Sequence, residues 1–335
     1  MKKKYDIYGI GAALVDTELE VTEADLCHLN IEKGLMTLVD KKRQEEITSY
    51  LSGNQVQASH TSGGSACNTI VAASYFGSNN FFSGKVAEDK NGKFFFDDLK
   101  NAGVETPEIT HEPGSTGTCL ILITPDAERS MNTFLGISGK LSDREINPQK
   151  IAESTYLYME SYLLTSESCK KAAINARKIA QGNNTKVAIS LSDPGIVSHF
   201  KNDLNDLIGE KVDMIFCNCD EALSFSNTNN LELAIDFIKN RSGEFVITLG
   251  EKGAIVFDGE KIIKIEGYPV KAIDSNGAGD MFAGAFLYGV CNNMSHQEAG
   301  ELASRSAAEV VSKYGPRLEP KSHKEILNKF KGLPI

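Results

Sequence analysis

Residues 274–286 have the sequence Asp-Ser-Asn-Gly-Ala-Gly-Asp-Met-Phe-Ala-Gly-Ala-Phe. The stretch starts as a polar, glycine-rich loop, and the apolar segment 281–290 that follows predicts a buried helix. Backbone N–H groups at a helix start lie at the positive end of its dipole, which suits an anion such as phosphate. Asp280 would repel that anion, and one reason to place it there is to accept a proton from a hydroxyl that attacks phosphorus. The alternative is that Asp280 only caps the helix.

Composition limits the classes of function. The chain has 335 residues, enough for one large α/β domain or a domain with an appendage. Its net charge of −10 and pI near 5.2 argue against nucleic acid or an anionic membrane as the main partner. Seven cysteines, without zinc-type spacing or a dense disulfide framework, favour reduced thiols and a cytoplasmic location. No apolar run is long enough to span a membrane.

From residue 150 onward, apolar strands alternate regularly with helical segments. This alternation predicts an α/β fold with a mostly parallel sheet that helices cover on both faces. The predicted strands are 155–159, 186–191, 212–217, 244–249 and 254–257, and the predicted helices are 167–181, 196–209, 219–226, 229–241, 280–291 and 296–313.

The N-terminal part of the chain has a different pattern. It predicts a buried first strand over 5–15 that ends at Asp16, then short strands near 19–22, 36–39 and 56–58 with one helix at 40–51 between them. A strand at 81–86 and a helix near 91–102 follow. A hairpin over 118–124 and 129–134 carries the same β-rich character. We therefore expect two parts: a β-rich lid made of 17–62 and 112–136, and a main domain made of 1–16, 63–111 and 137–335.

Polar residues and glycines follow several of the predicted strands. Asp16 ends the first strand, and Gly63-Gly64 with Asn68 precedes a helix of small residues. Asn218 and Glu221 follow the strand at 212–217, where they could position hydrated Mg²⁺. Taken singly, each group is explained by a turn or a helix cap. Together they predict a ligand site at the carboxyl-terminal edge of the sheet.

Two further stretches have alternative interpretations. Thr248, Gly250 and Gly253 follow another strand, where a nucleotide could pass the backbone or where a simple hairpin loop could form. Arg129, in the hairpin, is either an exposed charge on an edge strand or a lid arginine directed at phosphate.

These motifs resemble those of the ribokinase-like, PfkB-type carbohydrate and nucleoside kinases, over nearly the full length of the chain. Residues 274–280 resemble the C-terminal signature of that family, Gly63-Gly64-Ser65-x-x-Asn68 its N-terminal signature, and Asn218-x-x-Glu221 its metal-site motif. The resemblance implies a three-layer α/β/α sandwich with a small β-rich lid. Within the family, the chain is most similar to adenosine kinases, with supporting stretches at 116–119, 129–130 and 191–194.

The resemblance implies an ATP- and Mg²⁺-dependent transfer of the γ-phosphoryl group to the 5′-hydroxyl of adenosine or a similar nucleoside. Asp280 would be the general base, the amides of Gly277, Ala278 and Gly279 the anion hole, and Arg129 a neutraliser of phosphate charge. Glu221 would order Mg²⁺ through water, and Asp274 would be a ligand of a monovalent cation such as K⁺. The implied substrate-binding residues are Asp16, Gly63, Gly64, Asn68, Leu14 and Leu163, and the implied ATP-site residues are Asn218, Thr248, Gly250, Gly253, Gly277 and Gly279.

The sequence departs from the adenosine kinase pattern around the base. Ala12 and Leu35 align where that pattern has Asn and Gln, and Leu163, beside Tyr162, aligns with a stacking aromatic. A sugar or sugar-acid kinase of the ribose, fructose or 2-keto-3-deoxygluconate type is therefore the alternative hypothesis. A catalytically silent binding protein is a third, which the intact Asp280 argues against. We expect a monomer, or a homodimer formed by the lid strands.

Overall fold

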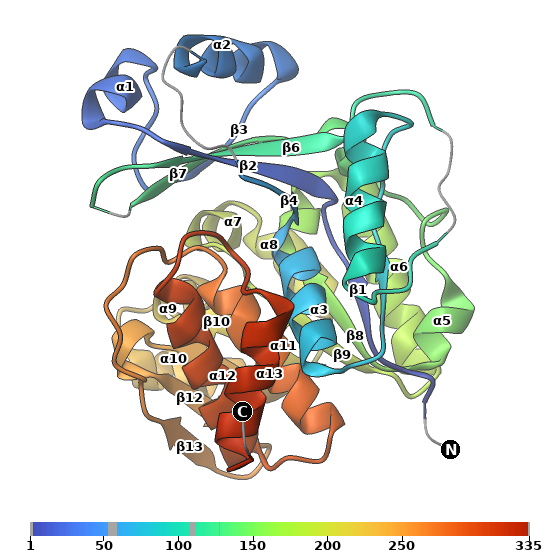
Figure 1. The fold of residues 1–335 in the computed structure, drawn as a ribbon. Helices are drawn as coiled ribbons and strands as arrows, with labels where there is room; N and C mark the ends of the chain where they lie inside the picture. The colour runs from blue at the N-terminus through green and yellow to red at the C-terminus, as the bar shows by residue number, and fades with distance from the viewer. Residues whose placement is uncertain (1–2, 53–58, 108–111, 127, 334–335) are drawn as a thin grey trace.

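The computed structural model describes residues 3–52, 59–107, 112–126 and 128–333. In this part of the chain the larger sheet has eight strands in the order β13-β12-β11-β10-β9-β8-β1-β5 (Figure 1). The neighbouring strands β11, β10, β9, β8, β1 and β5 pair in parallel, whereas β12 pairs antiparallel with both β11 and β13, so the predicted mostly parallel sheet is confirmed. Their bounds are β1 Tyr5–Ile10, β5 Asn80–Ser83, β8 Ser154–Glu160, β9 Lys186–Ser190, β10 Val212–Asn218, β11 Ser242–Thr248, β12 Ala254–Phe257 and β13 Ile262–Ile265.

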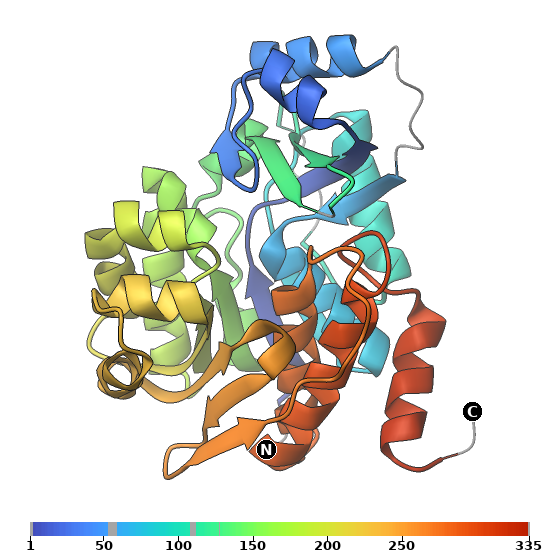
Figure 2. The same ribbon diagram turned by 90° about the vertical axis from the view of Figure 1, so that its left-hand side faces the viewer.

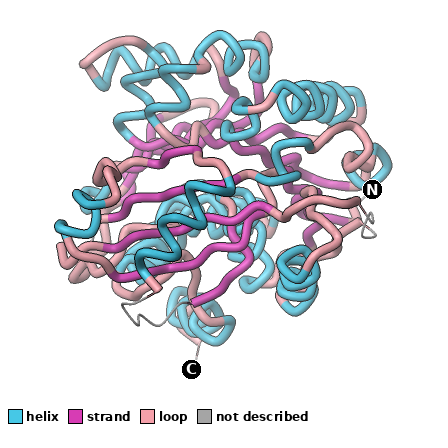
Figure 3. Tube along the Cα trace, turned by 90° about the horizontal axis from the view of Figure 1, so that it is seen from above, coloured by secondary structure: helices cyan, strands magenta, loops and turns pink. Residues whose placement is uncertain are grey.

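Helices cover both faces of this sheet (Figure 3). Side chains alternate between the two cores, so that Tyr156 and Tyr158 of β8 point to one and Leu157 and Met159 to the other. No helix in the described ranges is long and apolar enough to cross a membrane. One face carries α3 Ser65–Phe76, α4 Lys90–Asn101, α11 Ala278–Cys291, α12 His296–Val311 and α13 Pro320–Phe330, and the other carries α5 Pro148–Ala152, α6 Glu167–Gly182, α7 Pro194–His199, α8 Lys201–Ile208, α9 Cys219–Ser226 and α10 Leu231–Lys239.

The second, smaller sheet lies above the large sheet in Figures 1 and 2, and we call this part of the molecule the lid. Leu120 and Leu122 pack under helices α1 and α2, whereas Cys119 and Ile121, on the same strand, belong to an apolar cluster on the opposite face. The lid therefore has one face covered by helices and one turned to the main domain. Its elements are β2 Leu14–Glu20, α1 Glu23–His28, β3 Met36–Leu38, α2 Lys41–Leu51, β4 Ser59–Gly63, β6 Gly117–Ile123 and β7 Arg129–Phe134, with sheet order β3-β7-β6-β2-β4.

The structure corrects some of the predicted elements. The single strand expected over 5–15 is broken, because Gly11 packs too tightly against Ala66 and Glu160 to carry a side chain and the chain turns there into the lid. Asp16 therefore lies inside lid strand β2 rather than at the end of β1. The helix expected over 196–209 is two helices, α7 and α8. A strand expected near 56–58 lies outside the described residues. Elements that we did not predict are α1, α5, β13 and α13.

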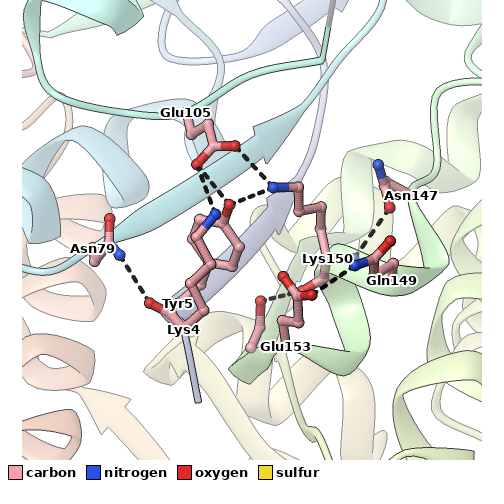
Figure 4. Close-up of polar contacts among 9 residues, drawn as sticks. Lys4, Tyr5, Asn79, Glu105, Asn147, Gln149, Lys150 and Glu153 are labelled. Atoms are coloured by element: carbon pink, nitrogen blue, oxygen red, sulfur yellow. Dashed lines mark hydrogen bonds and ion pairs between the residues drawn. The ribbon is translucent and has the colours of Figure 1, made fainter. Parts of the chain in front are cut away.

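The amino-terminal edge of the large sheet is held by paired charges (Figure 4). The Tyr5 hydroxyl donates to Glu105 Oε2 at 2.6 Å, and Lys150 Nζ donates to the Tyr5 hydroxyl at 2.6 Å and to Glu105 Oε1 at 2.9 Å. Partial burial raises the pKa of Glu105, but the hydrogen bonds from Tyr5 and Lys150 outweigh it and hold this pKa below its ordinary value. This cluster ties the start of β1 to α5 and to the segment after α4.

Candidate active site

A cavity of about 350 Å³ lies between the carboxyl-terminal edge of the large sheet and the inner face of the lid. Its floor includes Glu160 at the end of β8, Asn218 at the end of β10 and Asp280 in the first turn of α11. The lid contributes Asp16 and a set of apolar side chains. The cavity thus lies at the sheet edge where the sequence predicts a ligand site.

The loop 274–280 leads into this cavity at the start of α11. Gly277 is the N-cap, with φ of +74°, and a Cβ there would lie 2.3 Å from the carbonyl oxygen of Pro316. Only glycine fits both the backbone angle and the close contact. At Gly279 a Cβ would meet nothing within 4 Å, so the cavity side of the helix start is open. The helix predicted over 280–291 is confirmed, and it begins two residues earlier, at Ala278.

Asp280 is held by two donors from the start of α3. The Ser65 hydroxyl donates to Oδ1 at 2.6 Å, and Asn68 Nδ2 donates to Oδ2 at 3.1 Å. Burial raises the pKa of Asp280, and the two donors and the charge of Arg317 oppose that rise. The two glycine-rich motifs, more than 200 residues apart, therefore meet at one carboxylate.

Asp16 lies across the cavity on the lid strand β2, where it is 5% exposed. A Cβ at Gly63 would lie 2.0 Å from the Asp16 carboxyl carbon, so Gly63 makes room for this side chain without lining the cavity. Asp16 Oδ1 is buried and has no hydrogen-bond partner among the described residues. Burial raises the pKa of Asp16 to about 7, although the charge of Arg317 opposes it. A substrate hydroxyl could satisfy this oxygen.

Glu160 is a site residue that sequence reasoning missed. It is fully buried at the end of β8, and its carboxylate accepts hydrogen bonds from the backbone N–H groups of Ala12 at 2.7 Å and Ala66 at 2.5 Å. Burial raises its pKa to about 7 against these hydrogen bonds. The only signal in the sequence was a single acid at the end of an apolar strand. Arg317 and Ser65 were missed as well.

Asn218 and Glu221 form a capping box at the start of α9 and also line the cavity. Asn218 N and Nδ2 donate to the two Glu221 carboxylate oxygens at 3.0 and 2.7 Å. Burial raises the pKa of Glu221 to about 7, and the charges of Asp193, Asp220 and Asp280 add to the rise. Asn218 and Glu221 therefore do cap the helix, as the alternative interpretation expects. The Glu221 carboxylate also lines the cavity, where a cation would stabilise its ionised form.

The predicted ATP-site residues lie partly outside this cavity. Thr248 pairs in register with Asn218 across β10 and β11, so it lies beside the cavity edge. Gly250 has open space on its Cβ side, as a passing ligand would need. At Gly253, a Cβ would lie 2.0 Å from the Ile265 carbonyl oxygen. The packing of η3 Gly250–Lys252 against β13 therefore explains Gly253 without a ligand.

Arg129 is buried, so the interpretation as an exposed edge-strand charge is wrong. β7 lies between β3 and β6, and Arg129 is 5% exposed. Its guanidinium forms an ion pair with Asp274 and lies 3.9 Å from Glu18. Asp274 Oδ1 and Oδ2 also accept hydrogen bonds from the backbone N–H groups of Asn276 and Gly315, both at 2.7 Å. The arginine thus joins the lid to the glycine-rich loop.

The predicted base pocket requires corrections. Leu163 packs in the core between the sheet and α6 and does not line the cavity, because the 3₁₀ turn Ser161–Thr165 directs Tyr162 there instead. Leu35 is 48% exposed and also lies off the cavity, whereas Ala12 and Leu14 line it as predicted. The apolar wall comes mainly from the lid: Leu14, Met36, Cys119, Ile121, Met131 and Leu135.

Known proteins share this fold and this sequence pattern. A probable sugar kinase protein from Rhizobium etli CFN 42 has a solved structure with a TM-score of 0.91 and 30% identity, covering 99% of this chain and 100% of that chain. The adenosine kinase from Sinorhizobium meliloti gives a TM-score of 0.90 and 30% identity over 96% and 99%. A 5-dehydro-2-deoxygluconokinase from Clostridium botulinum (strain Alaska E43 / Type E3) is 28% identical over 282 residues, 80% of this chain and 83% of its own length.

The fold, the buried aspartate at a glycine-rich helix start and these similarities define the class of protein: an ATP-dependent carbohydrate or nucleoside kinase. The chain belongs to the pfkB family of carbohydrate kinases, whose family model matches residues 34–323.

Proposed function

We propose that this kinase transfers the γ-phosphoryl group of ATP to the 5′-hydroxyl of a nucleoside such as adenosine. Asp280 accepts the proton of the attacking hydroxyl, because it is the carboxylate beside the helix start and has a raised pKa. The backbone amides of Gly277, Ala278 and Gly279 stabilise the charge on the transferring phosphoryl group. Arrangement and charge stabilisation, rather than covalent chemistry, are what phosphoryl transfer requires.

The ribose hydroxyls bind between the lid and α3. Asp16 supports this assignment through its unsatisfied buried oxygen, and Asn68 and Gly64 line the same part of the cavity. Each hydrogen bond to a charged group contributes about 1.5–3 kcal/mol. Asp16 therefore both orients the sugar and sets its affinity.

The observation that favours a nucleoside is the apolar wall of the lid. Leu14, Ile121 and Met131 face the cavity, and together with their apolar neighbours they would contact an uncharged aromatic base. Arg129 is the only lysine or arginine among the described residues that line this cavity, and it is paired with Asp274. A substrate with a carboxylate would therefore find no free cation here, and five acids instead: Asp16, Glu128, Glu160, Glu221 and Asp280.

A sugar-acid kinase is the second candidate, and the similarity to a 5-dehydro-2-deoxygluconokinase favours it. The substrate in that name carries a carboxylate, which needs a cationic partner. In this chain Arg129 could serve only by leaving Asp274. Ala12 and Leu35, which replace the polar residues of the adenosine kinase pattern, are consistent with either candidate.

Mg²⁺ fits the residues at the start of α9. The described residues contain no group of three or more acidic, histidine or cysteine side chains that could hold a metal directly. Mg²⁺ commonly keeps several waters and is bound by one or two carboxylates together with substrate phosphates. Glu221 and Asn218 suit that role, since a nearby cation would lower the raised pKa of Glu221. When bound, Mg²⁺ would neutralise charge on the phosphates of ATP.

A monovalent cation does not fit Asp274 in this arrangement. Both carboxylate oxygens accept backbone hydrogen bonds, and the Arg129 guanidinium already balances the charge. We propose that Arg129 takes the place of K⁺ in this chain. The phosphate-neutralising role predicted for Arg129 would require that it break the contact with Asp274.

A panel assay tests the proposed substrate class. ADP release is measured with ATP and Mg²⁺ against adenosine, inosine, ribose, fructose and 2-keto-3-deoxygluconate. Adenosine should be preferred, and Ile121→Ala should raise its KM about tenfold or more by removing apolar contact with the base. Leu122→Ala is the matched control, because Leu122 lies on the covered face of the same strand and should leave KM unchanged. Turnover of the sugar acid alone would overturn the nucleoside proposal.

Two other expectations remain proposals. All seven cysteines are free thiols, which agrees with a reducing, cytoplasmic environment. The lid edge strands β3 and β4 could pair between subunits, and Leu35 and Leu38 near β3 are exposed. Sedimentation that shows a monomer at all working concentrations would exclude the lid-mediated dimer.

A further inference from the structure

Arg317 lies behind the start of α3, away from the cavity lining, in the segment that joins α12 to α13. Its side chain is 11% exposed. Nε donates to Asn68 Oδ1 at 2.8 Å, and Nη1 donates to Ser62 Oγ at 3.0 Å and to Asp98 Oδ2 at 3.1 Å. Asp98 of α4 thus anchors one side of the guanidinium, and the other side faces Asn68.

This contact fixes the orientation of the Asn68 amide. A guanidinium can only donate hydrogen bonds, and an ionised carboxylate can only accept them. Asn68 lies between the two, so its Oδ1 faces Arg317 and its Nδ2 faces Asp280 Oδ2 at 3.1 Å. Rotating the amide by half a turn would set NH₂ against the guanidinium and oxygen against the carboxylate, with both hydrogen bonds lost.

We propose that Arg317 is a positioning residue, which acts through Asn68 to keep Asp280 oriented and ready to accept the substrate proton. The inference rests on the proposed function, in which Asp280 is the general base. It assigns a role in the reaction to a residue that neither touches substrate nor belongs to the two glycine-rich motifs.

The charges around Asp280 explain why such support is needed. Burial disfavours the ionised form of Asp280, and the charge of Asp280 in turn raises the pKa of Asp16, Glu160 and Glu221. Arg317 is the cation that opposes this effect at both Asp16 and Asp280. The titratable groups that interact with Asp280 are Asp16, Glu160, Glu221, Tyr158, Tyr162 and Arg317.

The test is the pH profile of kcat/KM for Arg317→Met and Arg317→Lys. Arg317→Met should move the acid limb to higher pH by about one unit, so that activity at pH values well below the limb falls about tenfold relative to the plateau at higher pH. Arg317→Lys keeps the charge but lacks the planar donor fork, so it should restore most of the acid limb while kcat stays low. Ser65→Ala, which removes the other donor to Asp280, is the positive control for a measurable shift.

A purely structural role for Arg317 would lower activity equally at all pH values, and that result would overturn the proposal. The combined variant Arg317→Met with Asn68→Ala gives a second measurement. On the plateau above the acid limb, where the charge of Arg317 matters least, the combined variant should lose no more than about twofold beyond Asn68→Ala alone, because Arg317 positions Asp280 through Asn68. Additive losses there would contradict the proposal. Asp280→Asn, assayed in parallel, distinguishes failure of the proposed function from failure of this inference. If Asp280→Asn is active, Asp280 is not the general base. If Asp280→Asn is inactive and the pH profile of Arg317→Met equals that of the wild type, only the role of Arg317 is refuted.

Discussion

At the amino-terminal edge of the large sheet, Lys150 lies between Tyr5 and Glu105, with both contacts under 3 Å. At the carboxyl-terminal edge, Glu160 and Glu221 accept hydrogen bonds from backbone N–H groups. The pKa of Glu105 is lowered by its partners, whereas burial raises the pKa of Glu160 and of Glu221 to about 7. The first edge balances its charges within the protein, and the second leaves carboxylates that a ligand can stabilise.

This difference shows how function is distributed on one sheet. Charges paired within the protein add modestly to stability and need no ligand. Buried carboxylates without an opposite charge cost stability and are retained at sites that bind cations, hydroxyls or phosphate. Substitutions at the two edges should therefore act on different quantities: activity at the carboxyl-terminal edge, and only stability at the amino-terminal edge.

The largest effect is expected for Asp280→Asn. The amide cannot accept the substrate proton, so kcat should fall by about 10²–10⁴-fold. Substrate affinity should change little, because Ser65 and Asn68 can still hydrogen-bond to the side chain. Steady-state kinetics with binding calorimetry measures both quantities. A variant that kept more than a tenth of the wild-type kcat would show that Asp280 is not the base.

Asp16→Asn should have the second largest effect. Loss of a charged acceptor for the substrate hydroxyls should lower kcat/KM by about 10–100-fold, in agreement with 1.5–3 kcal/mol per charged hydrogen bond. The ligand-free protein should become more stable at pH 8, because a buried charge has been removed. Glu105→Gln is the matched change at the opposite edge, and it should leave kcat/KM unchanged while lowering stability. An unchanged kcat/KM in Asp16→Asn would remove Asp16 from the sugar site.

The sequence was sufficient to predict those features of the site that depend on one local stretch of the chain. The glycine-rich helix start at Gly277, Asn68 of α3 and the hairpin of β6 and β7 were predicted because glycines, caps and two-residue alternation are local signals. Asn68 and Asp280 were both predicted to lie at one sheet edge, but the hydrogen bond between them was not predicted.

Contacts set by packing could not be predicted. Arg317 reaches Asn68 across 249 residues, and no periodicity encodes that contact. Tyr162 rather than Leu163 faces the cavity, because a single 3₁₀ turn decides which neighbour points inward. In the sequence, Glu160 is only an acid at the end of an ordinary strand. Its role depends on the backbone N–H groups of Ala12 and Ala66, which come from distant parts of the chain.

The pH dependence of stability tests the buried carboxylates around the cavity as a group. Asp16, Glu160 and Glu221 each have a pKa of about 7 in the folded protein, above the ordinary range, so the folded state retains protons that the unfolded state releases. The free energy of unfolding should therefore fall as pH rises toward and through 7. His323, whose pKa burial lowers to about 4, acts in the opposite direction below about pH 6.5.

The decline should accordingly be steepest between about pH 5 and 7. Three such carboxyl groups should together lose several kcal/mol, at roughly 1.4 kcal/mol per proton and pH unit, partly offset by His323. Urea unfolding of the ligand-free protein at four pH values in this range measures it. Asp16→Asn should flatten the curve, and Glu105→Gln should not. Stability that rises across the range would contradict the raised pKa values.

Lys150→Met should have a small effect, confined to stability. The ion pair with Glu105 is partly exposed, and such pairs contribute about 0.2–1 kcal/mol. We expect a loss in that range, smaller at 1 M salt because of screening, with kcat/KM within about twofold of the wild type. Thermal unfolding at low and high salt provides the measurement. A large loss of activity would show that the two edges are coupled.

The smallest effect is expected when K⁺ is replaced by tetramethylammonium in the assay. The Arg129 guanidinium already lies against Asp274, whose two oxygens also accept the N–H groups of Asn276 and Gly315. Activity should therefore change by less than about twofold, because a neutralised carboxylate attracts a further cation only weakly. Arg129→Met leaves the Asp274 charge without its partner, and this variant should gain activation by K⁺. If the wild type itself were strongly activated by K⁺, Arg129 would have to leave Asp274 during turnover, and its predicted role at the phosphate would become the better explanation.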